Sequence, residues 1–276
     1  MSELEKFSIY INDKSKATIK TYTAMYKKLR NMLEKDIAEA SQKKICDTAM
    51  SETNRNSSQG LINIGLMVRK MEGLKINELE AQRKKNQIAL AEHVKKKNQQ
   101  IGDSLPSLQE LEDYTDYLYE HGTWKEYIIN YLLINYQVRN KDLVFEIVKR
   151  KKDANEKDKN YMWLRGRVVT YIRRNYKTSN VYGERVHKIT DPKFVTAIRR
   201  IIGLQNIGED AGTFIPTESQ AGYYIQKMSY KSLGEGNYCK IVIDANRSNL
   251  QKIREISENR GTSLSELIHS YDIENK

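Results

Sequence analysis

Residues 134–143 read Ile-Asn-Tyr-Gln-Val-Arg-Asn-Lys-Asp-Leu, and the rest of the chain can be organised around them. An apolar helical pattern precedes this stretch, and an apolar strand is expected from 143 to 148. Arg139 lies in the polar turn between the two. Because a rigid element holds each side of the turn, the planar guanidinium can be aimed at a phosphate. A binding site is therefore expected at this helix-to-strand junction.

Composition indicates an intracellular, helix-rich protein of two domains. The 276 residues are 39% hydrophobic and 30% charged, with only 3 prolines,. No apolar run is long enough to cross a bilayer, and the first residues lack the apolar core of a signal peptide, so we expect neither a membrane partner nor secretion. The 2 Cys and 4 His show no metal-ligand spacing, so no metal site and no disulfide are expected,.

Positive charge is concentrated in one part of the chain. The formal net charge is +11, and residues 146–200 hold sixteen Lys and Arg against six Asp and Glu. Such a concentration favours a polyanion partner over a merely solvated basic face, because each phosphate contact releases a counterion. The candidate nucleic-acid contacts are Lys149, Arg150, Lys151, Lys152, Arg173 and Arg174, together with Lys84 and Lys85 earlier in the chain.

Apolar spacing in the first hundred residues predicts a small helical domain. After a short apolar lead-in at 4–11, helices are expected at 15–33, 34–46, 61–73 and 76–99, with a polar loop at 53–58,. Such a domain is either a plain bundle or a basic clamp against a duplex. Gly102 and Pro106 mark the best linker, which divides the chain into domains 1–103 and 104–276.

The second domain mixes helices with a small antiparallel sheet, which makes the chain α+β but mostly helical. Helices are expected at 108–119, 125–136, 192–202 and 218–228, and across 249–269 with a break at 260–263. Strands are expected at 143–148, 161–164, 168–172 and 185–189, the last two joined as a hairpin by a turn at 180–183,. Lys177 precedes that turn, and Tyr271 follows the last helix.

This order of features resembles the tyrosine recombinase, or phage integrase-like, family, in a divergent form of viral or mobile-element type. The resemblance implies a core-binding-like domain and a catalytic-like domain that clamp double-stranded DNA as a tetramer. It implies DNA recombination and integration through a 3′-phosphotyrosyl intermediate, without a cofactor. Arg139 matches the first catalytic arginine, Asp142 the acidic residue after it, Lys177 the hairpin lysine and Tyr271 the nucleophile,.

The second half of the site departs from the family pattern. The His-x-x-Arg motif should fall where residues 237–240 read Asn-Tyr-Cys-Lys, which makes Lys240 the candidate third cation, and Thr262 lies where a His or Trp should follow. Arg247, Arg254 and Arg260 are alternatives to Lys240 that spacing does not separate. A lysine lacks the guanidinium fork. A second hypothesis is therefore a catalytically degenerate, architectural DNA-binding protein, and a third is an RNA-binding scaffold.

Overall fold

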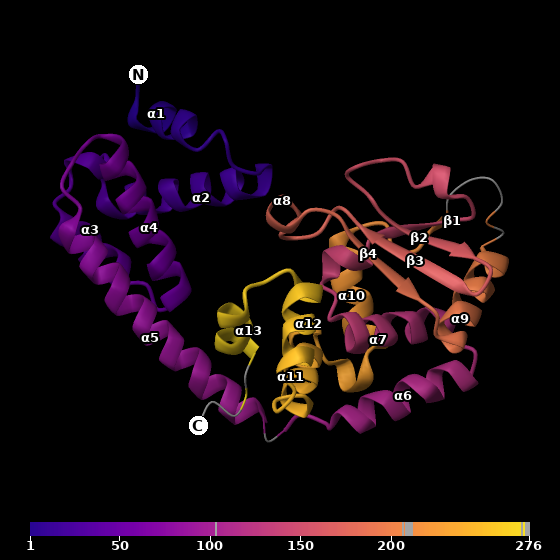
Figure 1. Ribbon diagram of the computed structural model, residues 1–276. Coiled ribbons are helices and arrows are strands. Elements are labelled where there is room, and N and C mark those ends of the chain that lie inside the picture. The colour runs from indigo at the N-terminus through magenta and orange to yellow at the C-terminus, as the bar shows by residue number, and fades with distance from the viewer. Residues whose placement is uncertain (103, 206, 208–211, 272, 274–276) are drawn as a thin grey trace. The chain divides into compact units, whose positions relative to one another are not determined.

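The computed structural model describes residues 1–276 except 103, 206, 208–211, 272 and 274–276 (Figure 1). Its chain divides into two units, Met1–Lys96 and Lys97–Lys276. The boundary expected at 103 lies past the end of α5, and residue 103 itself is outside the described residues. The mostly helical α+β class expected from the sequence is confirmed.

The first unit is helical throughout its described residues. Its elements are α1 (Glu3–Tyr10), α2 (Lys16–Leu33), the 3₁₀ turn η1 (Ile37–Glu39), α3 (Gln42–Met50), α4 (Arg55–Met71) and the start of α5 (Asn77–Gly102). The apolar lead-in is a helix because Ser2 and Glu5 form a reciprocal capping box,. The Glu3 carboxylate is buried and accepts hydrogen bonds from the Tyr26 hydroxyl (2.7 Å) and the Ala38 N–H (2.7 Å).

The second unit holds a five-stranded sheet in the order β4-β3-β2-β1-β5. The strands are β1 (Phe145–Val148), β2 (Asn160–Arg165), β3 (Val168–Arg173), β4 (Arg185–Ile189) and β5 (Gly212–Thr213). The expected β3–β4 hairpin is present, with Tyr171 opposite His187. The sheet is mixed rather than wholly antiparallel, because β1 runs parallel to β2, with Phe145 opposite Asn160.

Helices of the second unit pack around α7 (Trp124–Tyr136), which contacts α6, α9, α10, α11 and α12. The remaining bounds are α6 (Leu108–Glu120), η2 (Asn140–Leu143), η3 (Lys151–Asp153), α8 (Ser179–Tyr182), α9 (Pro192–Leu204), α10 (Glu218–Met228), η4 (Tyr230–Ser232), α11 (Glu235–Ala245), α12 (Leu250–Arg260) and α13 (Leu264–Tyr271). Asp191 caps α9, and Pro192 is the first residue of the helix. An aspartate cap and a proline at the first position both favour a helix start at this point,.

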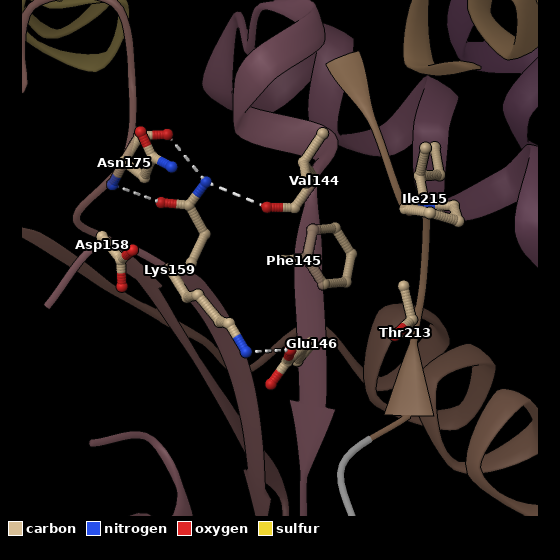
Figure 2. Close-up of a pocket in the computed structure, with 10 residues that line it drawn as sticks. Val144, Phe145, Glu146, Asp158, Lys159, Asn175, Thr213 and Ile215 are labelled. Atoms are coloured by element: carbon tan, nitrogen blue, oxygen red, sulfur yellow. Dashed lines mark hydrogen bonds and ion pairs between the residues drawn. The ribbon is translucent and has the colours of Figure 1, made fainter. Parts of the chain in front are cut away.

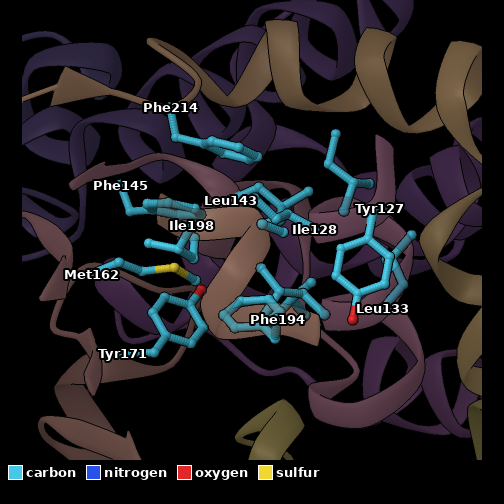
Figure 3. Close-up of a cluster of buried hydrophobic side chains, with 14 of the residues drawn as sticks. Tyr127, Ile128, Leu133, Leu143, Phe145, Met162, Tyr171, Phe194, Ile198 and Phe214 are labelled. Carbon is cyan, nitrogen blue, oxygen red and sulfur yellow. The ribbon is translucent and has the colours of Figure 1, made fainter. Parts of the chain in front are cut away.

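The core of the second unit joins α7 and α9 to the inner face of the sheet. Figure 3 shows Leu143 and Phe145 beside Ile198 of α9 and Phe214, which follows β5. The rings of Phe145 and Phe214 stack with centroids 4.5 Å apart. This packing fixes both ends of the turn that carries Arg139, because Ile134 and Val138 before it and Leu143 after it are all buried,.

Candidate functional site

The Arg139 guanidinium lies at the helix-to-strand junction and has no partner among the described residues. Helix α7 stops because Gln137 adopts a left-handed conformation (φ 45°, ψ 42°), and Arg139 then precedes η2. Its backbone N–H donates to the Asp142 carboxylate at 2.8 Å, which fixes the turn. The side chain is half-buried, and among the described residues it makes no hydrogen bond and no ion pair. A partly enclosed guanidinium with unused donors is suited to an anion.

Asp142 and Arg173 form a buried ion pair behind that turn. Arg173 is 0% exposed, and its Nη1 donates to Asp142 Oδ2 at 3.3 Å. Its Nη2 donates to the Asn259 carbonyl at 2.7 Å and lies 3.1 Å from Nε2 of His187. Burial, together with the charge of Arg173, lowers the pKa of His187 to about 4,. Arg173 therefore ties η2, β3, β4 and α12 together.

Arg260, the last residue of α12, lies against Tyr271. The side chain is 1% exposed, and its Nη2 donates to the Tyr271 hydroxyl at 2.7 Å. The same nitrogen donates to Glu235 Oε1 at 3.2 Å, and Nη1 donates to the Gln137 carbonyl at 3.0 Å. The guanidinium also stacks over the Tyr271 ring, 4.6 Å from its centroid,. Of the three arginines that spacing left open, the structure brings Arg260 to the tyrosine.

Glu235 is a site residue that the sequence analysis missed. It lies in the first turn of α11 and has one carboxylate oxygen, Oε2, that is buried without a hydrogen-bond partner among the described residues. Burial raises the pKa of this carboxyl, and the guanidinium charges of Arg260 and Arg139 oppose that rise,. Arg260 thus joins Glu235 to Tyr271 by direct hydrogen bonds, and the charge of Arg139 acts on the same carboxyl. We refer to Arg139, Glu235, Arg260 and Tyr271 as the arginine–tyrosine cluster.

Lys177 lies on a loop that contacts the end of α12. The Thr178 hydroxyl donates to the Gly261 carbonyl at 2.6 Å, so the segment after β3 is tied to the turn next to Arg260. Lys177, the residue before, is exposed. Gly261 has φ +58°, and a Cβ there would meet the Thr178 hydroxyl at 2.5 Å. The close approach of these two segments thus requires glycine.

Lys240 is half-buried on α11 and makes no hydrogen bond or ion pair with the arginine–tyrosine cluster in the part of the chain that the structure describes. Burial lowers the pKa of its ammonium group, and the charge of Lys97 lowers it further. Its charge acts on Cys239, whose thiol pKa burial raises to about 11. Thr262 contributes its carbonyl oxygen, which accepts the Ser257 hydroxyl at 2.7 Å, so it serves the α12–α13 turn.

The candidate DNA contacts differ in exposure. Arg173 is fully buried and presents no surface to a polyanion, because its donors serve the interior. Arg174 donates to Glu184 and to the Ala154 carbonyl, the latter at 2.9 Å. The exposed side chains are Lys149, Arg150, Lys151 and Lys152 after β1, and Lys84 and Lys85 on α5; among these, Arg150 pairs with Asp153 at 3.0 Å.

A pocket of about 230 Å³ lies between β1, β5 and the start of β2 (Figure 2). Lys159 on its wall bonds to Glu146 at 2.9 Å. Asn160 donates to the carbonyls of Val144 (3.1 Å) and Asn175 (3.0 Å). These polar groups are hydrogen-bonded within the protein, so their role at the pocket is structural. Through the Asn175 carbonyl, Asn160 also holds the loop that leads to Lys177.

In the part of the chain that the structure describes, no helix is long and apolar enough to cross a membrane.

Comparison with known proteins gives a distant structural likeness. No family model matches the chain, and no curated protein matches it. Among solved structures, the chain is similar to one described as "Crystal structure of XerA recombinase", with 14% sequence identity and a TM-score of 0.41. The similarity covers 99% of this chain and 94% of that chain. At this distance no residue role is taken from that protein.

Proposed function

We propose that this chain is a DNA-binding tyrosine recombinase that cleaves and rejoins DNA strands through a 3′-phosphotyrosyl intermediate at Tyr271. One observation carries the proposal: Nη2 of Arg260 donates to the Tyr271 hydroxyl at 2.7 Å, beside a carboxyl on which the Arg139 charge also acts. A tyrosine hydroxyl and one guanidinium group are thus in contact, and a second guanidinium, far away in sequence, acts on the carboxyl beside them. The basic residues 149–152 would provide sequence-independent contacts to the duplex,.

The site residues fit the steps of such a reaction. The Tyr271 oxygen forms a bond to phosphorus while the bond from phosphorus to the 5′ oxygen breaks. Negative charge grows on the non-bridging oxygens, and the unused donors of Arg139 face that charge, while Arg260 holds the attacking oxygen,. Lys177 is exposed on the loop that Thr178 connects to Gly261, and it would donate a proton to the leaving 5′ oxygen,. Lys240 would add positive charge from α11.

Glu235 would take the proton that the phenol loses. Its carboxylate bonds to the same Arg260 nitrogen as the phenol, and one of its oxygens has no partner in the described residues. Burial raises its pKa, which brings a carboxylate closer to the range useful for proton transfer near neutral pH,. We expect Glu235→Gln to slow adduct formation and to remove the acidic limb of its pH profile, with duplex affinity unchanged.

A nicked suicide duplex tests the reaction, because the short fragment released by cleavage diffuses away and traps the covalent adduct. We expect an adduct that survives SDS with the wild-type chain and none with Tyr271→Phe. Tyr223→Phe changes an exposed tyrosine of α10 and should leave the adduct intact. Arg139→Lys should lower the rate by roughly 10²–10³, as for loss of one transition-state donor. No wild-type adduct across a library of duplex sequences would reject the enzyme.

A second candidate is an architectural DNA-binding protein on the same fold. It is favoured by Arg260, which is 1% exposed and has both terminal nitrogens bonded within the protein. In this state its fork is closed to a phosphate. Duplex binding with a steep salt dependence, no adduct and unchanged affinity in Tyr271→Phe would support this candidate. We further propose that the domain of residues 1–103 clamps the duplex through Lys84 and Lys85, and that an active assembly is a tetramer on DNA.

A further inference from the structure

A second cavity lies away from the arginines, between α6, α7 and the start of α9. Its volume is about 350 Å³. The residues that matter on its wall are acidic or aromatic: Glu112, Asp113, Asp116, Tyr127, Tyr131 and Asp191. No step of the proposed reaction uses this cavity. We refer to it as the acidic pocket.

The acidic pocket has a charge opposite to that of the chain as a whole. Its four carboxylates face one cation, Lys193, which bonds to Asp116 at 2.8 Å. Glu112 has no hydrogen-bond or ion-pair partner among the described residues. Asp191 has one oxygen committed to the N–H of Phe194 as the cap of α9. The excess of negative charge, in a protein with a net charge of +11, favours a cationic ligand,.

Tyr127 is an independent indication of a ligand. The residue is 1% exposed, and in the part of the chain that the structure describes its hydroxyl makes no hydrogen bond. Its ring is held by Tyr119 and Tyr131, at centroid distances of 5.3 and 5.9 Å. Burial raises the pKa of this phenol, and the charges of Asp191 and Asp116, which line the same pocket, raise it further. Because Tyr127 lines the pocket and its hydroxyl has no partner within the described residues, the hydroxyl is free to accept a hydrogen bond from a bound group,.

The arrangement fits an organic cation better than a metal ion. In the described residues, no three Asp, Glu, His or Cys side chains are close enough together to hold one ion. An ammonium group has three donors that can be shared between separate carboxylates and a phenol oxygen, and tyrosine rings attract its charge and pack against its alkyl chain. We propose that the acidic pocket binds an alkylammonium group, with Asp191 and the Tyr127 hydroxyl as its main acceptors.

Two sources could supply this group: a free linear diamine, or a lysine side chain from a second copy of this chain. The second source is present in the sequence, because Lys149, Lys151 and Lys152 are exposed on the segment after β1. The chemistry of recognition is the same for both. The site does not depend on the proposed recombinase function, since none of its residues belongs to the arginine–tyrosine cluster.

Calorimetric titration of the full chain with 1,5-diaminopentane, at matched ionic strength against NaCl, tests the free ligand. Tyr127→Phe removes only the hydroxyl, and Asp191→Asn keeps a residue that caps α9, so both variants should fold. We expect saturable binding that each variant weakens roughly tenfold, as for loss of one hydrogen bond to a charged group. Glu218→Gln changes an exposed carboxylate outside the pocket and should leave the affinity unchanged.

Sedimentation of the same proteins tests the second source. The ligand would be assigned to a second copy if the chain self-associates and the diamine reverses that association. Asp191→Asn and the double variant Lys151→Gln/Lys152→Gln should then each weaken it. The proposal is overturned if the wild-type chain shows neither saturable diamine binding nor self-association sensitive to Asp191. It is also overturned if Tyr127→Phe and Glu218→Gln give the same affinities as the wild type.

Discussion

Arg260 and Tyr271 are joined by a hydrogen bond of 2.7 Å, and the same guanidinium holds the Gln137 carbonyl at 3.0 Å. The side chain of Arg260 therefore links the end of α7 to α13, the last described helix. This link makes Arg260 both a structural residue and a candidate catalytic one. Experiments on the site must separate the two roles, because a variant that unfolds gives no information about chemistry.

Arg260→Ala should destabilise the second unit strongly. It leaves the buried Gln137 carbonyl and the partly buried Glu235 carboxylate without their donor, and breaking a buried ion pair costs about 3–5 kcal/mol, which is an upper bound for this partly exposed pair,. Urea unfolding at pH 7 measures the loss. Arg254→Ala, an exposed arginine of the same helix, should stay within about 0.5 kcal/mol of the wild type,. Equal losses in both variants would contradict the buried role of Arg260.

His187 should make the chain less stable in mild acid. Its pKa is lowered from an ordinary value of 6.5 to about 4 in the folded state, so the unfolded chain binds the proton first as pH falls,. The resulting stability is full above pH 6.5 and is lost as pH falls towards 4. Between pH 7 and 4, the wild type should lose up to about 3 kcal/mol relative to His187→Gln.

Urea unfolding at several pH values compares the two proteins in that window. His93→Gln, which changes an exposed histidine of α5, provides the matched control and should follow the wild-type curve. Parallel curves for the wild type and His187→Gln would show that this imidazole does not resist protonation in the folded chain.

Gly261→Ala should destabilise the fold and disturb the loop that carries Lys177. A Cβ at this position meets the Thr178 hydroxyl at 2.5 Å and a Tyr176 ring carbon at 3.0 Å, in addition to the strain of φ +58°,. Gly166→Ala isolates the positive φ, because φ there is +57° but no atom lies within 4 Å. Thermal melting should show a larger loss at 261 than at 166, and the reverse order would be inconsistent with the close packing.

Lys151→Gln/Lys152→Gln should weaken duplex binding and reduce its salt dependence. If both lysines contact phosphates, the slope of log K against log salt concentration should fall by about 1 for each contact. Fluorescence anisotropy with a labelled duplex at several salt concentrations measures the slope. Lys227→Gln removes an exposed charge on α10 and serves as control. A slope unchanged in the double variant would exclude this segment from the interface.

Sequence patterns located elements well where capping and periodicity agree. The helix expected at 218–228 is α10, and the break expected at 260–263 separates α12 from α13 at Gly261. Local signals can also be misread. Residues 53–58 were expected to form a polar loop, but Asn54 is the N-cap of α4, which begins at Arg55. Pairing between strands depends on contacts distant in sequence, so the parallel β1–β2 ladder and the two-residue β5 were not foreseen.

The candidate site was foreseen only in part, for a similar reason. Arg139 lies in a turn whose neighbouring elements can be read locally, whereas the choice among three later arginines depends on helix rotation. One signal could have found Arg260: it follows the buried Ile253 and Ile256 at helical spacing, so it lies on the inner face of α12, while Arg254 faces outward,. Nothing in the local sequence marks Glu235, because its role depends on Arg260 being beside it.

The bond between Arg260 and the Gln137 carbonyl also bears on biosynthesis, because it joins residues 123 positions apart. A ribosome adding 5–20 residues per second makes the second partner roughly 6–25 s after the first. During that interval the left-handed end of α7 has no guanidinium to hold its carbonyl. Tyr271 is translated later still, so the bond between Arg260 and Tyr271 can form only after the end of α7 has waited for both residues.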